Sequence, residues 1–466
     1  KLGETTQSLA DVRGARTKRD SEGLRMQDRI LVGRLRETDT TWLPDSGPPK
    51  RIEHHDDGTI LHILKESLPF YERGYTIRSH STLRAQQLAG YKPVVVTSLG
   101  FPRQQGFEGF PLEETIDGIG HHRLDLGPLY NPTSVPYDLR LSDDAFLTAR
   151  LAHDIAPTAI QVGSGYRGYE TALVGLSVAR NIGVPLVYEI RSFLEQTWTG
   201  EVERSESGEY YRRRYEQEVR CLTDADHVVT IAEAMKEEIV ARGIDADKIS
   251  VAPNVVDTER FAPREKPEEL IERYGLGARP VLGYISNLGW REGIQHLVEA
   301  VHILRSEGHD VCGLVVGEGP EMKMLEALVA EHGLESDFVL TGHVPNEQIE
   351  DHYALIDLFV VPRVNDRAAR LVTPLKPLEA MSMGKPVIAA DLPALRELVL
   401  PGERGFVFET ENSQSLADVA LQALTDTEST QRLALAGQKW VREDRTIAAN
   451  SERYRQILES VLSGAI

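Results

Sequence analysis

Short apolar runs alternate with longer stretches of helical spacing along most of the chain. Residues 59–64, 94–97 and 281–285 have the length and composition of strands that are buried on both faces. Residues 76–88 and 294–305 follow such runs and repeat their apolar positions with the period of a helix. Alternation of this kind predicts parallel sheets with helices on both faces.

The alternation lapses once, around residues 251–269, where prolines and charged residues dominate and a linker is expected. The sequence therefore predicts the α/β class, with two Rossmann-like, doubly wound domains at residues 51–252 and 253–440. Residues 1–50 are polar, and we expect an extension that lies on the first domain, with a homodimer contact as the alternative. Residues 441–466 are expected to form a terminal helix.

The net charge is −20, which argues against a nucleic-acid partner, because such proteins usually carry a basic surface. An anionic ligand would need a local cluster of cations in so acidic a chain. One loop region offers such a cluster, formed by Arg363, Arg367, Arg370 and Lys376.

The two cysteines, Cys221 and Cys312, lie far apart in the sequence and indicate neither a disulfide framework nor a zinc site. His121 and His122 are neighbours on an expected strand and so point to opposite faces, which argues against a metal site. No apolar run approaches the roughly 18 residues of a membrane span. No secretory signal is visible either, and we expect a cytoplasmic protein.

Residues 371–391, LVTPLKPLEAMSMGKPVIAAD, are expected to form a loop, a helix, a turn and a strand. The start of a helix offers unpaired amides and partial positive charge, which suit an anion. Lys376 lies at that start, and Glu379 lies three residues further on, where its carboxylate can reach sugar hydroxyls. These residues alone allow two interpretations. They can form a binding site for a nucleotide diphosphate, or an ordinary α/β crossover with a capping Glu.

The stretch TPLKPLEAMSMGKPVIAAD at residues 373–391 resembles the nucleotide-sugar signature of the retaining GT-B glycosyltransferases of family 4, the glycosyl transferases group 1. The segment PNVVDTERF at residues 253–261 and GEGP at residues 317–320 are similar to two other motifs of that family. The resemblance covers roughly residues 58–460. It implies two domains facing across a cleft, with the C-terminal helix crossing back to the first domain.

The activity implied by the resemblance is transfer of a sugar to an acceptor hydroxyl or other nucleophile with retention of anomeric configuration. The donor would be a nucleoside-diphosphate sugar of the UDP or GDP type, used without a metal or a cofactor. The acceptor is left unknown, and carbohydrate or secondary-metabolite biosynthesis would be its setting.

The family's usual Arg and Lys in the first loop of the second domain are replaced here by Asn287 and Glu292. Arg291 and Lys376 are therefore expected to supply the catalytic positive charge. Many members also carry an acid eight residues before Glu379, where this chain has Leu371. The residues expected to bind the donor are Gly74, Ser286, Asn287, Gly317, Arg363, Thr373, Pro374, Leu375 and Glu379.

The loop at residues 69–78 corresponds to a glycine-rich loop of the family, with Arg73-Gly74 in place of adjacent glycines. The residues expected to bind the acceptor are Tyr75, Arg78, Ser164, Tyr166 and Arg191. Glu189 ends an expected strand and is a candidate catalytic base. A buried Glu–Arg pair that only holds the loop is the alternative for Glu189.

Other functions remain open on the sequence. A nucleotide-sugar epimerase can use the same two-domain fold, and a non-catalytic nucleotide-sugar binding module can keep the basic seat. An NAD-dependent oxidoreductase comes last, because the third glycine of the fingerprint is missing after residues 317–319 and Pro320 follows.

Overall fold

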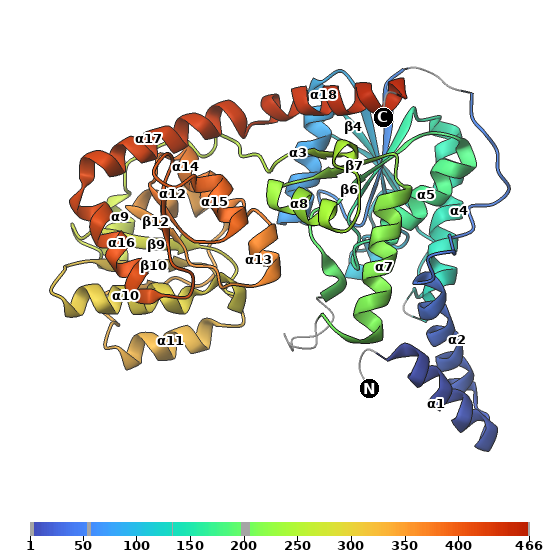
Figure 1. The fold of residues 1–466 in the computed structure, drawn as a ribbon, viewed down its shortest axis with the longest axis horizontal. Helices are drawn as coiled ribbons and strands as arrows, with labels where there is room; N and C mark the ends of the chain where they lie inside the picture. Colours follow the sequence, from blue (N-terminus) through green and yellow to red (C-terminus); the bar gives the residue numbers. More distant parts are fainter. Residues whose placement is uncertain (1–3, 54–56, 133, 197–205, 465–466) are drawn as a thin grey trace. The chain divides into compact units, whose positions relative to one another are not determined.

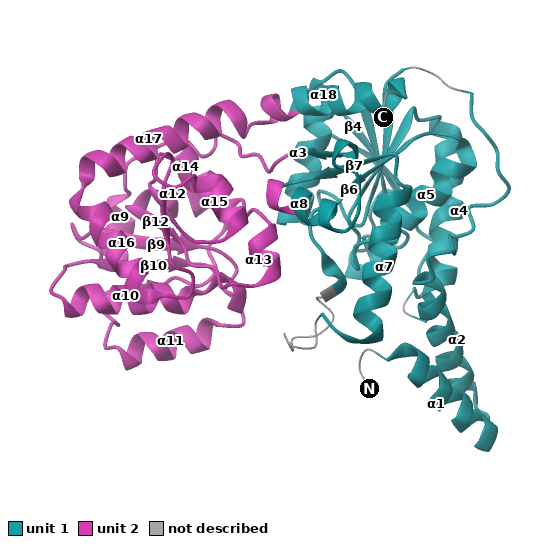
Figure 2. Ribbon diagram, in the orientation of Figure 1, with its two compact units in different colours: residues 1–231, 236–252, 451–466 teal, residues 232–235, 253–450 magenta. Residues whose placement is uncertain are grey.

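The computed structural model describes residues 4–53, 57–132, 134–196 and 206–464. The chain divides into two compact units (Figure 2). Unit 1 comprises residues 1–231, 236–252 and 451–466, and unit 2 comprises residues 232–235 and 253–450.

The sheet of unit 1 has the strand order β3-β4-β2-β1-β5-β6-β7-β8. All neighbouring strands are parallel except β3 and β4, which are antiparallel. From β1 the chain adds β2 on one side, and it later returns to add β5 on the other side of β1. The order in which strands are added therefore reverses between β1 and β5. Ligands of such sheets bind outside the carboxyl ends of the strands at this switch. The bounds are β1 (Thr59–Leu64), β2 (Lys92–Thr97), β3 (Glu113–Ile116), β4 (Ile119–Arg123), β5 (Ala159–Gly163), β6 (Leu186–Glu189), β7 (His227–Thr230) and β8 (Ile249–Val251).

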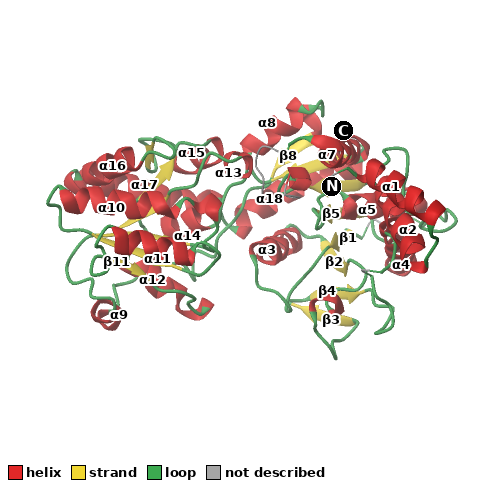
Figure 3. Cartoon of the chain, turned by 90° about the horizontal axis from the view of Figure 1, so that it is seen from below, coloured by secondary structure: helices red, strands yellow, loops and turns green. Residues whose placement is uncertain are grey.

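Helices cover both faces of this sheet, with α3 on one side and α4 and α5 on the other (Figure 3). Strand β1 is buried along its whole length as a result, which explains its unbroken apolar character. The helices that flank this sheet are α3 (Gly74–Leu88), α4 (Tyr137–Ile155), α5 (Glu170–Ile182), α7 (Gly208–Asp224) and α8 (Glu233–Ala241), with single turns at η1 (Arg103–Gln105), η2 (Leu194–Gln196) and η3 (Ala246–Lys248). Helix α8 belongs to unit 1 from residue 236 onward.

Two N-terminal helices, α1 (Thr5–Lys18) and α2 (Glu22–Glu37), form a hairpin that extends from the end of α4 (Figure 1). Asp28 of α2 pairs with Arg13 of α1, with 2.9 Å between Oδ1 and Nε. The backbone amide of Thr6 donates to Glu209 Oε2 of α7 at 2.8 Å, which ties α1 to unit 1.

The sheet of unit 2 has the order β11-β10-β9-β12-β13-β14, and all its neighbouring strands are parallel. Its switch lies between β9 and β12. The strands are β9 (Val281–Ile285), β10 (Cys312–Val316), β11 (Phe338–Leu340), β12 (Leu358–Val361), β13 (Val387–Ala390) and β14 (Phe406–Phe408). The helices are α9 (Glu268–Arg273), α10 (Ile294–Ser306), α11 (Met322–Glu331), α12 (Ile349–Leu355), α13 (Arg367–Leu371), α14 (Lys376–Ser382), α15 (Pro393–Val399), α16 (Ser413–Thr425) and α17 (Thr427–Asp444), with turns η4 (Trp290–Glu292) and η5 (Asn346–Gln348).

The predicted α/β class with two doubly wound domains is confirmed. The last helix, α18 (Ile447–Ser463), joins unit 1 from residue 451 onward, as expected for the C-terminal helix. Its Tyr454 hydroxyl lies 3.3 Å from Thr82 Oγ1 of α3, so the C-terminal helix is hydrogen-bonded to a helix that lies 372 residues earlier in the sequence.

Candidate active site

The loops after β9 and β12 meet at the switch of unit 2. Gly293 has φ +63°, and a Cβ added there would lie 2.0 Å from the carbonyl oxygen of Pro362. The amide of Val364 donates to the carbonyl of Arg291 at 3.1 Å. Only a glycine allows the two loops to approach this closely, so their charged residues share one edge of the sheet.

The loop after β10 packs against the first residues of the loop after β9. Gly317 has φ +135°, and a Cβ there would lie 1.9 Å from the carbonyl oxygen of Ser286. The Ser286 hydroxyl is buried and has no hydrogen-bond partner among the described residues. Asn287 is exposed. The glycine thus serves close backbone packing, and the Ser286 hydroxyl keeps an unused hydrogen-bonding capacity.

Arg363 does not carry an uncompensated charge. Its Nε and one terminal nitrogen donate to the two carboxylate oxygens of Glu292 at 3.2 and 3.1 Å. The Tyr284 hydroxyl also donates to Glu292. Burial alone would lower the pKa of Arg363, but Glu292 and Tyr284 raise it. Glu292, the residue found where the family has Lys, therefore neutralises the arginine on the neighbouring loop.

Arg291 and Lys376 are partly exposed cations of this edge, with side chains 42% and 35% exposed. The Nε of Arg291 donates to Asp366 Oδ2 at 2.9 Å, and the same oxygen accepts from the amide of Ala368 in the first turn of α13. Each cation is held by one acid and keeps part of its surface toward solvent. Such partly exposed pairs are weak and can rearrange around a ligand.

Glu379 lies one turn into α14, with 8% of its surface exposed. Its Oε2 accepts from Lys376 Nζ at 3.0 Å and from the buried Tyr353 hydroxyl at 2.5 Å. Both bonds go to one oxygen, which leaves Oε1 for another donor. Because α14 has only seven residues, its dipole is short, and side chains supply most of the positive charge here.

The segment before α14 is held from two sides. Asn254 Nδ2 donates to the carbonyl of Thr373 at 2.8 Å, and Arg363 donates to the carbonyl of Val372 at 3.3 Å. Thr373 and Pro374 are buried, whereas Leu375 is half-buried. Asn254, from the segment between the two sheets, thus helps to fix the signature loop.

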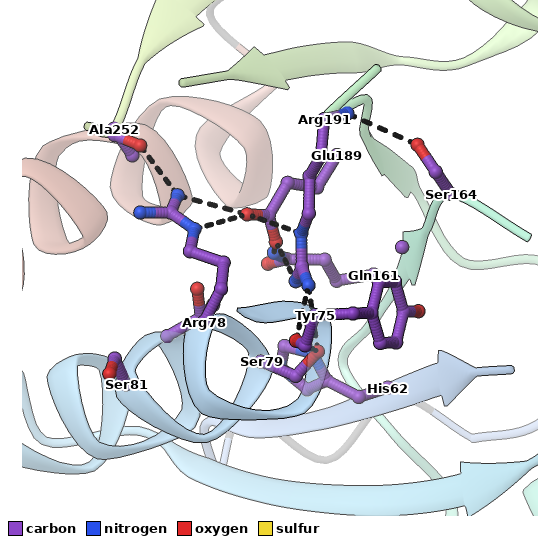
Figure 4. Close-up of polar contacts among 12 residues, drawn as sticks. His62, Tyr75, Arg78, Ser79, Ser81, Gln161, Ser164, Glu189, Arg191 and Ala252 are labelled. Carbon is purple, nitrogen blue, oxygen red and sulfur yellow. Dashed lines mark hydrogen bonds and ion pairs between the residues drawn. The ribbon is translucent and has the colours of Figure 1, made fainter. Parts of the chain in front are cut away.

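Glu189 of unit 1 is enclosed by two guanidinium groups (Figure 4). Arg78 donates to Oε1 from Nε at 3.1 Å and from a terminal nitrogen at 2.9 Å. Arg191 donates to Oε1 at 3.1 Å and to Oε2 at 3.0 Å. The exposed fractions of Glu189, Arg78 and Arg191 are 1%, 4% and 8%. Glu189 therefore has the geometry of a buried Glu–Arg pair, which the sequence analysis gave as the alternative to a catalytic base.

A chain of buried amides continues from this pair. Gln161 Nε2 donates to Glu189 Oε2 at 3.0 Å, Gln86 donates to Gln161 Oε1 at 2.6 Å, and His62 Nε2 lies 2.7 Å from Gln86 Oε1. Burial would raise the pKa of Glu189, but Arg191 and Arg78 lower it to about 2. Burial lowers the pKa of His62 to about 4. A carboxylate so strongly paired is a poor proton acceptor near neutral pH.

Ser164 and Tyr166 lie on the loop after β5, beside the loop after β1. Ser164 is buried, and its Oγ accepts from the amide of Arg191 at 3.1 Å. Tyr166 is 44% exposed, and its hydroxyl donates to the carbonyl of Lys65 at 3.3 Å. The expected acceptor residues of unit 1 thus lie together, but only the tyrosines present a side chain that is not buried.

Lys65 and Glu66, which the sequence prediction did not name, follow directly on β1 and lie beside the expected acceptor residues. The Nζ of Lys65 lies 4.2 Å from the ring centre of Tyr75 and 5.3 Å from that of Tyr166. Burial lowers the pKa of Lys65. Glu66 is 5% exposed. The available signal was a pair of charged residues at the carboxyl end of a buried strand.

A cavity of about 300 Å³ lies on the same edge of the sheet, beyond the ends of β2 and β4. Arg103 and Asp125 line it and form an ion pair of 2.6 Å, and Tyr130 adds a hydroxyl. The neighbouring Gln105 donates to the Tyr166 hydroxyl at 3.0 Å, which links this wall to the loop after β5.

Gly74, the one expected donor residue in unit 1, begins α3, and a Cβ there would meet no atom within 4 Å. Among the residues that the structure describes, no three His, Cys, Asp or Glu side chains are grouped as metal ligands would be. Over the same residues, none of the helices combines the length and the apolar character that crossing a membrane requires.

Two family models match the chain. "Glycosyl transferase 4-like domain" matches residues 73–255, and "Glycosyl transferases group 1" matches residues 267–440. Among curated relatives, the chain is 28% identical over 243 residues to a GDP-mannose-dependent alpha-(1-6)-phosphatidylinositol monomannoside mannosyltransferase of Mycolicibacterium smegmatis, covering 51% of this chain and 63% of the relative. It is 31% identical over 229 residues to a 2-deoxystreptamine glucosyltransferase of Streptomyces kanamyceticus, covering 48% and 58%. The chain thus spans about three fifths of the length of these relatives.

Solved structures share the fold over most of the chain. A sucrose-phosphate synthase from Thermosynechococcus elongatus superposes with a TM-score of 0.68 at 19% identity, covering 87% of this chain and 99% of that one. The Anabaena protein HepE in complex with UDP gives a TM-score of 0.66 at 20% identity, covering 86% and 100%.

Proposed function

Because the chain belongs to the group 1 glycosyltransferases of the GT-B fold, we propose that it moves a sugar from a nucleoside-diphosphate sugar to an acceptor hydroxyl, with retention and without a metal ion. The observation that carries the proposal is the Lys376–Glu379 pair at the start of α14. It combines an accessible cation with a carboxylate that still has one oxygen to offer.

The chemical need is to stabilise a leaving group. As the bond from the anomeric carbon to the diphosphate oxygen breaks, its electron pair passes to the diphosphate, while the acceptor oxygen bonds to the same carbon. Arg291 and Lys376 would then turn from Asp366 and Glu379 toward the developing charge. Fixed cations that meet charge only as it forms lower the barrier more than they strengthen ground-state binding.

The remaining donor contacts follow from the same segment. Glu379 Oε1 would accept from the ribose hydroxyls, while Tyr353 keeps the other oxygen in place. Leu371 cannot replace the acid found in many family members, so backbone groups of residues 373–376 would read the donor sugar. The unpartnered Ser286 hydroxyl would contact the diphosphate or its sugar.

Glu189 would not take the acceptor proton, because its pKa of about 2 makes it a weak base. We assign that proton to an oxygen of the departing diphosphate, which leaves on the same face of the sugar in a retaining transfer. Glu189 would instead position Arg191 and Arg78. Lys65, Glu66 and Tyr166 would contact the acceptor, and this mixture of hydrogen-bond donors and acceptors suits a molecule rich in hydroxyl groups.

The first experiment measures thermal stabilisation by UDP, GDP, dTDP and NAD. A ligand that binds only the folded state at a hundredfold excess over Kd stabilises by about 2.7 kcal/mol. We expect one nucleoside diphosphate to raise Tm, and Lys376→Ala to abolish that rise. The matched control is Lys439→Ala, which removes a lysine that is 74% exposed on α17. Stabilisation by NAD alone, or by none of the four, would refute the proposal.

The second experiment tests transfer itself. The corresponding sugar nucleotides are offered with a panel of hydroxyl-rich acceptors, namely myo-inositol, 2-deoxystreptamine, methyl α-mannoside and phosphatidylinositol, with and without EDTA. Proton NMR of the product reads the anomeric configuration. Inversion would overturn the assignment of a retaining mechanism, and loss of activity in EDTA that Mg²⁺ restores would overturn metal independence.

A further inference from the structure

We propose that the N-terminal helical hairpin α1–α2 is part of the acceptor side of the site, where Glu37 positions the loop of residues 163–169 through Arg167. This inference rests on the proposed function, because it assigns Tyr166 of that loop to the acceptor. Both family models begin at residue 73 or later, so the hairpin lies outside the matched regions.

Glu37 is the last residue of α2, and only 2% of its surface is exposed. One carboxylate oxygen forms an ion pair with a terminal nitrogen of Arg167. The other accepts from the Tyr169 hydroxyl at 2.7 Å. Burying a carboxylate is costly unless it is paired, and both partners of Glu37 come from the one segment that leads from β5 into α5.

Arg167 is held on every side. Its guanidinium carbon lies 3.7 Å from the ring centre of Tyr137, which is on α4. Its backbone amide donates to both carboxylate oxygens of Glu170, at 2.8 and 3.0 Å. Its carbonyl accepts from Arg214 of α7 at 3.1 Å. The ion pair with Glu37 therefore acts on a residue whose backbone is itself a fixed point of the loop.

The fixed point determines where the neighbouring side chains lie. Tyr166 directly precedes Arg167, and its hydroxyl bonds to the carbonyl of Lys65 and accepts from Gln105. Ser164, three residues before Arg167 in the same loop, accepts a hydrogen bond from the amide of Arg191. A loop that lost its anchor at Arg167 would let Tyr166 leave the Lys65 ammonium, and the acceptor face would change shape.

The test compares Glu37→Ala and Glu37→Gln with Glu22→Ala, an exposed acid on the same helix. Hydrogen–deuterium exchange of residues 163–170 is the first readout, since the amides of Gly165 and Arg167 are hydrogen-bonded inside the loop. We expect exchange there to accelerate by about tenfold or more in Glu37→Ala. The exchange rate in Glu37→Gln, which keeps an oxygen for Tyr169, should lie between those of Glu37→Ala and Glu22→Ala.

The second readout is kinetic, with whichever acceptor of the panel is turned over. We expect the KM for the acceptor to rise by about tenfold, because small displacements of positioning groups are costly, while the KM for the donor and the thermal shift with the nucleoside diphosphate stay unchanged. Unchanged exchange in the loop, or equal losses toward donor and acceptor, would overturn the inference. The exchange result does not depend on turnover, so a failure of the proposed function is recognised separately, by the absence of nucleotide stabilisation.

Discussion

Replacing Glu189 by Gln is the sharpest test of the buried network in unit 1. The substitution keeps the shape of the side chain but leaves Arg78 and Arg191, which are 4% and 8% exposed, without their shared counter-charge. Removing one partner of a buried ion pair typically costs about 3–5 kcal/mol, because the remaining charge is left uncompensated in a poorly solvated place.

The lowered pKa of Glu189 provides a second magnitude. The carboxylate has its ordinary pKa of 4.5 in the unfolded chain and about 2 in the folded one. The difference corresponds to about 3 kcal/mol, in agreement with the first figure. Because the folded pKa is the lower one, this stability is complete above pH 4.5 and is lost as the pH falls from 4.5 toward 2.

The assay is differential scanning calorimetry at pH 7, since the two units can unfold in separate transitions. A loss of 3–5 kcal/mol should lower the Tm of the unit 1 transition by about 10 °C. Glu452→Gln is the matched control: it removes an acid that pairs with Arg455 at 2.5 Å on the exposed side of α18, and Tm should not change. A Glu189→Gln variant with the Tm of the wild type would refute the electrostatic reasoning.

Two further outcomes are expected. Between pH 7 and pH 5, His62→Gln should lose about 2 kcal/mol less unfolding free energy than the wild type, measured by urea unfolding. A histidine with a pKa of about 4 when folded and 6.5 when unfolded stabilises the protein above pH 6.5 and loses this contribution as the pH falls toward 4. An identical loss in both proteins would contradict this. Gly293→Ala should abolish nucleotide-induced stabilisation, because its Cβ would lie 2.0 Å from the carbonyl oxygen of Pro362, and the left-handed backbone costs a further ~1–2 kcal/mol. Gly289→Ala, in the same loop with no atom within 4 Å, should bind as the wild type does, and equal effects of the two substitutions would exclude the close approach as the cause.

Local patterns determined the fold class and the signature segment. The 3.6-residue and buried-strand periods are properties of neighbouring residues, and they predicted both doubly wound halves and the order of loop, helix, turn and strand at residues 371–391. Gly384, with φ +74°, directly follows Met383, the residue that caps α14, and takes the left-handed conformation that commonly ends a helix. The motifs therefore predicted the elements of this edge of unit 2, and nucleotide binding there stays a prediction.

Which charges remain available was decided by the tertiary structure alone. Glu292 and Arg363 are 71 positions apart and Glu37 and Arg167 are 130 apart, and each pair meets only because of how strands and helices are ordered around a sheet. The same order turns Glu189 from a candidate base into a fully paired carboxylate. A sequence specifies the identity of a charged residue, but its pKa and its reach depend on partners and burial, which are long-range properties of the folded chain.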